Sequence, residues 1–128
     1  MIKNWNYHAL HMDFSSMYIG NDHPSDIDMM YLCDDGTLIL GEIKHRSGEF
    51  KIGQRKLMQK IIDMHEGDGF GLYITHNKKV QNGDKVVDVS RCMVEEIYCK
   101  WEGKWRNTKQ YTTVGEVFEY LRERGRCR

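Results

Sequence analysis

Residues 27–45 read IDMMYLCDDGTLILGEIKH, and this stretch decides the fold. Two mainly apolar runs flank the Asp-Asp-Gly segment at residues 34–36. Gly36 can adopt the left-handed conformation that a tight hairpin turn requires. We therefore expect two antiparallel strands, at residues 27–33 and 37–45.

The length of the hairpin loop decides which side chains share a face of the sheet. A three-residue loop places Asp28 opposite Glu42 and Asp26 opposite Lys44, with all four side chains on one face. A two-residue loop would put Asp28 and Glu42 on opposite faces, because a slip of one residue inverts every side chain.

The rest of the chain predicts a mixed sheet flanked by helices. Residues 1–22 contain a weak helical stripe and are the least readable part. Thr113 and Glu116 match a capping box before an amphipathic helix that Gly125 ends. Further elements are expected at residues 54–65 (helix) and at 69–75, 85–89, 93–100 and 104–106 (strands). The fold class expected is α/β (α+β), with a C-terminal hairpin and helix added to the core.

Length and composition favour a single cytoplasmic domain spanning residues 1–128. The chain has 128 residues, 40% of them hydrophobic, and no apolar run that approaches the roughly 20 residues needed to cross a bilayer. Its four cysteines lie far apart without a C-x-x-C pair, so we expect reduced thiols and no zinc site.

The formal net charge of zero hides an uneven distribution. Residues 13–42 contain seven acidic residues and no Lys or Arg, whereas residues 43–60 contain six basic residues and one acidic residue. Such a pattern suits a cation site beside a polyanion, although two solvated faces of opposite charge would produce it as well.

Asp28, Glu42 and Lys44 form the candidate chemical site. Two carboxylates at the end of an otherwise apolar face need a cation or ion-pair partners, because two desolvated anions repel each other. Oxygen ligands without sulfur or a histidine cluster favour Mg²⁺ or Mn²⁺ over Zn²⁺. The structural alternative is that Asp26, Glu42 and Lys44 form cross-strand ion pairs and that Asp28 caps a loop.

At these residues the sequence resembles the PD-(D/E)XK nuclease superfamily. Asp28 stands in the place of the first acid of the motif and Glu42-Ile43-Lys44 in the place of its E-x-K. The pattern Pro-Ser-Asp-Ile-Asp, Glu-Ile-Lys and Gly-Gln resembles an uncharacterised phage-type branch and covers roughly half of the chain, residues 13–76.

The resemblance implies a restriction-endonuclease-like core and Mg²⁺-dependent cleavage of DNA phosphodiester bonds. Asp28, Glu42 and the Ile43 carbonyl would bind the metal, and Lys44 would assist the attacking water. Asp26 would be either a further carboxylate close to the metal or a turn residue. Gln54 would touch the site from the next helix, although an exposed glutamine at the start of a helix is equally compatible with the sequence. Nucleic-acid contacts are expected from Arg46, Lys51 and Arg55.

The substrate and the assembly stay open at this point. A homodimer is compatible with double-strand cleavage, and the cytoplasm would be that of the host cell if the protein is phage-encoded. The alternative function is a non-catalytic module on the same fold that binds DNA or a protein, for example a phage-encoded inhibitor.

Overall fold

A computed structural model describes residues 27–45, 52–77 and 87–125 of the protein. The elements in chain order are β1 (Met29–Leu32), β2 (Leu38–His45), α2 (Ile52–Met64), β3 (Gly69–His76), the 3₁₀ turn η3 (Val89–Arg91), β4 (Met93–Cys99), β5 (Lys104–Thr113) and α3 (Val114–Glu123). The five strands form one sheet in the order β1-β2-β3-β4-β5. Only β2 and β3 run parallel, so the expected mixed sheet is confirmed. The helical stripe expected within residues 1–22 lies outside the described residues.

The β1–β2 hairpin has the register that a three-residue loop predicts. Met29 pairs with Gly41 and Leu32 with Leu38. The amide of Cys33 donates to the Thr37 carbonyl at 2.9 Å, and Gly36 closes the turn with φ of 89°. Extending this register by one pair places Asp28 beside Glu42.

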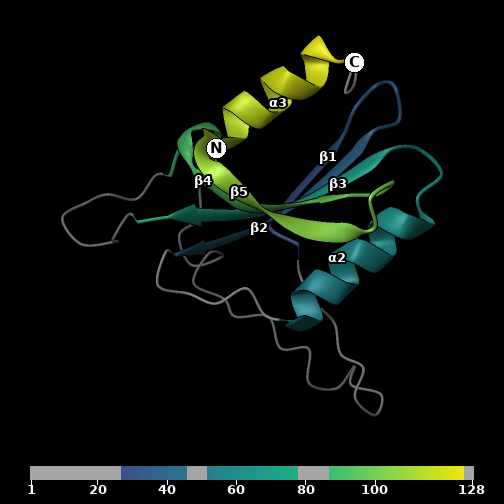
Figure 1. Ribbon diagram of the computed structural model, residues 1–128, viewed down its shortest axis with the longest axis horizontal. Coiled ribbons are helices and arrows are strands. Elements are labelled where there is room, and N and C mark those ends of the chain that lie inside the picture. The colour runs from purple at the N-terminus through teal and green to yellow at the C-terminus, as the bar shows by residue number, and fades with distance from the viewer. Residues whose placement is uncertain (1–26, 46–51, 78–86, 126–128) are drawn as a thin grey trace, which may run out of the picture.

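The two helices cover opposite faces of the sheet (Figure 1). Met58 and Ile62 of α2 pack on one face against Leu38 and Leu40 of β2. On the other face, Val117 of α3 belongs to a second core cluster. Glu42 lies two residues after Leu40 in β2, so its side chain points to the same face of the sheet, the face covered by α2.

The helix α3 begins where its capping box predicts. Thr113 Oγ1 accepts a hydrogen bond from the Glu116 amide at 3.2 Å, and the Glu116 carboxylate accepts from the Thr113 amide at 3.3 Å. The β4–β5 hairpin leads directly into this helix. The hairpin extends the central sheet, where the sequence suggested a separate addition to the core.

Two expectations need correction. The strand expected at residues 85–89 is wrong over its described part, because the Asp88 side chain accepts from the Ser90 amide and turns the chain into η3. The thiols are not all reduced, since Cys33 forms a disulfide.

Two glycines provide a matched test of the packing between α2 and β3. A Cβ at Gly69 would lie 2.6 Å from Ile62 Cγ2, a core atom, whereas a Cβ at Gly53 would meet nothing within 4 Å. We expect Gly69→Ala to lower the free energy of unfolding by about 1–3 kcal/mol, as overpacking does. Gly53→Ala should raise it by up to about 1 kcal/mol through helix propensity. Urea unfolding measures both, and equal effects would contradict this packing.

Candidate metal and phosphodiesterase site

Asp28 extends the hairpin through its side chain. Its Oδ2 accepts a hydrogen bond from the Ile43 amide at 2.8 Å. The carboxylate thus takes the place of a backbone acceptor immediately before Met29, the first residue of β1. Asp28 itself is exposed. A solvent-facing carboxylate is thereby anchored at the point where β2 carries the Glu-Ile-Lys segment.

Glu42 is the buried member of the site, with only 4% of its surface exposed. Its Oε1 accepts a hydrogen bond from Gln54 Nε2 at 2.8 Å and lies 3.3 Å from Lys44 Nζ. Gln54 reaches it from the first turn of α2, as the sequence resemblance implied. Lys44 lies two residues further along β2 on the same face.

Burial and the neighbouring charges both act on the pKa of Glu42. Burial raises the pKa of the Glu42 carboxyl above its ordinary value, and the charge of Asp28 raises it further. The ammonium of Lys44 acts in the opposite direction, yet the net shift of the pKa is upward. The folded protein therefore disfavours the ionised form of Glu42.

The donor set fits a hard divalent cation. Asp28 and Glu42 supply carboxylate oxygens, which Mg²⁺ and Mn²⁺ prefer, and a cation between them would offset the repulsion that raises the pKa of Glu42. Gln54 Oε1 is buried here without a hydrogen-bond partner in the described part of the chain, so it can accept from a bound water. Within that same part, no three His, Cys, Asp or Glu side chains form a metal-binding group.

The remaining predicted residues divide into two groups. Asp26, Arg46 and Lys51 lie outside the described residues. Arg55 is described, and its guanidinium forms two hydrogen bonds to the Glu96 carboxylate, one of them at 2.7 Å from Nη1 to Oε1. The predicted nucleic-acid residue thus already holds an internal partner.

The neighbours of the site on β3 and β4 were missed from the sequence. Glu42 is aligned with Tyr73 of β3, which is aligned in turn with Glu96 of β4. Burial and the charges of Glu95 and Glu96 raise the pKa of Tyr73. A cleft of about 440 Å³ adjoins this row, lined by Tyr73, Thr75, Glu95, Glu96, Asn107 and Thr108. No sequence pattern joins these residues, because their proximity depends on the order of strands in the sheet.

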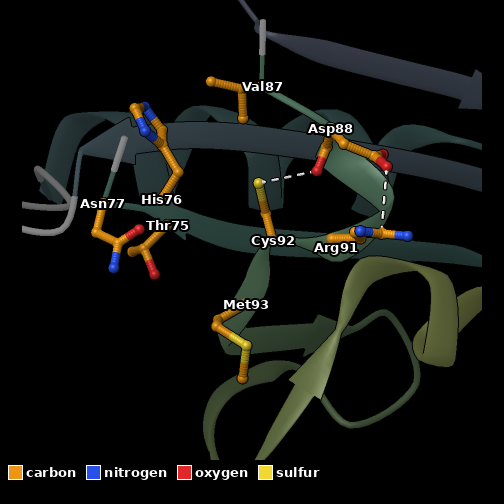
Figure 2. A pocket seen from close by; sticks show the side chains of 8 residues that line it. All are labelled: Thr75, His76, Asn77, Val87, Asp88, Arg91, Cys92 and Met93. Carbon is orange, nitrogen blue, oxygen red and sulfur yellow. Dashed lines mark hydrogen bonds and ion pairs between the residues drawn. The ribbon is translucent and has the colours of Figure 1, made fainter. Parts of the chain in front are cut away.

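A second hollow of about 270 Å³ lies where β3 ends and η3 begins (Figure 2). His76 lines it, and its Nδ1 is buried without a hydrogen-bond partner among the described residues. The Cys92 thiol points into this hollow and donates to the Asp88 carbonyl at 3.4 Å. Cys92 belongs to the core on the α3 face, and Thr75 lines both this hollow and the cleft beside Tyr73.

Comparisons with protein-family models, curated proteins and solved structures gave no match. Among the described helices, none is long and apolar enough to cross a membrane.

Proposed function

We propose that this protein is a metal-dependent nuclease of the PD-(D/E)XK type that hydrolyses DNA phosphodiester bonds with Mg²⁺ or Mn²⁺. The observation that carries the proposal is the buried Glu42, which has the Lys44 ammonium 3.3 Å away and the exposed Asp28, bonded to the Ile43 amide, beside it. The mixed sheet with a helix on each face is compatible with the restriction-endonuclease-like core that belongs to this proposal.

In this proposal, Asp28, Glu42 and the Ile43 carbonyl hold the metal. The ion, when bound, supplies Lewis-acid activation of water and neutralises charge on the phosphate. Gln54 fixes the orientation of the Glu42 carboxylate through its amide. Lys44 places an ammonium 3.3 Å from that carboxylate, where it can hydrogen-bond to the attacking water and stabilise negative charge developing on the phosphate.

The choice of DNA as the substrate rests on the sequence resemblance and on the basic segment at residues 43–60. Of the basic residues proposed for phosphate contacts, Arg46 and Lys51 belong to the stretch between β2 and α2. Lys44 is the next-to-last residue of β2 (Leu38–His45), the strand that leads into that stretch.

The test is a substrate panel of duplex, single-stranded, flapped and four-way-junction DNA, together with RNA, incubated with Mg²⁺, Mn²⁺ or EDTA. We expect cleavage of at least one DNA substrate with either metal and none in EDTA. Binding without cleavage in every metal would contradict the proposal and favour a non-catalytic binding module.

A further inference from the structure

The first turn of α2 is tied to the sheet at two neighbouring residues. Gln54 donates to Glu42 on β2, and Arg55 pairs with Glu96 on β4. The fully buried side chains of this helix, Met58 and Ile62, come from later turns. The position of the first turn over the site therefore depends on these two polar links.

The Arg55–Glu96 pair is a two-point, largely shielded ion pair. The guanidinium meets the carboxylate through two hydrogen bonds, a geometry more specific than a single ion pair. The Glu96 side chain is only 15% exposed, and the Arg55 guanidinium lies 5.9 Å from the centre of the Trp105 ring on β5. Two strands, β4 and β5, thus contact the Arg55 side chain.

The strand register places Glu96 in the same cross-strand row as Glu42. Tyr73 separates Glu96 from Glu42 in a single row across the sheet. Gln54 and Arg55 are consecutive on α2 and reach the two carboxylates at the ends of that three-residue row. A shift of the first turn would move the Gln54 amide relative to Glu42.

We propose that Arg55 and Glu96 are positioning residues, which hold the first turn of α2 so that Gln54 orients Glu42 for cation binding. This inference rests on the proposed function and reassigns Arg55 from a phosphate contact to an internal support of the metal site. Partners that orient metal ligands typically change metal affinity or activity by about 10–100-fold when they are removed.

The chain offers a matched control at the other end of the same helix. Tyr98, also on β4, donates to Asp63 of α2 at 2.6 Å. Burial and this hydrogen bond raise the pKa of Tyr98 to about 12, so the link stays protonated throughout the neutral range. Tyr98→Phe removes a link between β4 and the Asp63 end of α2, whereas Glu96→Gln and Arg55→Lys weaken the link at the first turn, next to Gln54.

The experiment measures three quantities for each variant: the rise in melting temperature caused by Mn²⁺, kcat with Mg²⁺, and the salt dependence of DNA affinity in EDTA. We expect Glu96→Gln and Arg55→Lys to need about 10–100-fold more Mn²⁺ for the same rise and to lower kcat, with unchanged DNA affinity. Tyr98→Phe should lower the melting temperature in EDTA and leave the Mn²⁺ response and kcat unchanged. In the Glu96→Gln background, Gln54→Ala should have little further effect on the Mn²⁺ response.

Two results would overturn the inference. If all three variants lose stability but keep the wild-type Mn²⁺ response, the Arg55–Glu96 pair is merely structural. If Arg55→Lys instead weakens DNA binding and flattens its salt dependence, Arg55 is a phosphate contact. The Mn²⁺ response needs no substrate, so a wild-type protein that cuts nothing would refute the proposed function and leave this comparison decisive.

Discussion

Asp28→Asn and Glu42→Gln are each expected to lower the rate of DNA cleavage in Mg²⁺ about 10³-fold or more, because each removes one of the two carboxylates that the proposed function assigns to the cation. Lys44→Ala should lower it about 10²–10³-fold, the usual effect of removing one group that stabilises charge in the transition state. The measurement is the single-turnover rate on the best substrate of the panel.

The control for these substitutions is Glu119→Gln, which removes an exposed carboxylate from α3 on the other side of the sheet. We expect it to cleave at the wild-type rate. Cleavage within about threefold of wild type in all three site variants would contradict the assignment of the site, since losses at a reacting centre are of the order of 10² or more.

Glu42→Gln should also make the protein more stable when no divalent cation is present. The raised pKa of Glu42 means that the folded state binds more protons than the unfolded state between the ordinary pKa of 4.5 and the raised one. The contribution of Glu42 to stability is therefore full below the ordinary pKa and is lost as pH rises through the raised pKa. Glutamine keeps the shape of the side chain and never ionises.

The measurement is the melting temperature of both proteins in EDTA from pH 5 to pH 8. We expect the advantage of Glu42→Gln to grow with pH; in a domain of this size about 1 kcal/mol corresponds to roughly 3–5 °C. Added Mg²⁺ should stabilise only the wild type and reduce the difference. If the Glu42–Lys44 pair served stability alone, Glu42→Gln would lower the melting temperature at pH 8, and this account would be wrong.

Local signals in the sequence predicted the hairpin but left its register dependent on the length of the loop. The structure has the register of a three-residue loop, which brings Asp28 beside Glu42. For Gln54 the sequence left a contact with the site and an exposed position equally open, and the hydrogen bond to Glu42 agrees with the contact.

Interactions between segments that are far apart in the sequence were not predicted. The pairing of Arg55 with Glu96 requires β4 to lie next to β3. The alignment of β3 with β4 also shifts by one residue between Tyr73 and Ile74, and no local pattern signals this irregularity. The error at residues 85–89 has a similar origin, because a side-chain cap at Asp88 outweighed the strand propensity of its valine neighbours.

The most direct test of the metal site is Mn²⁺ binding, followed by the loss of the electron paramagnetic resonance signal of the free ion. We predict saturable binding to the wild-type protein at pH 7.5 and its loss in both Asp28→Asn and Glu42→Gln. Equal binding by the wild type and the two variants would contradict the central claim that Asp28 and Glu42 hold the catalytic cation.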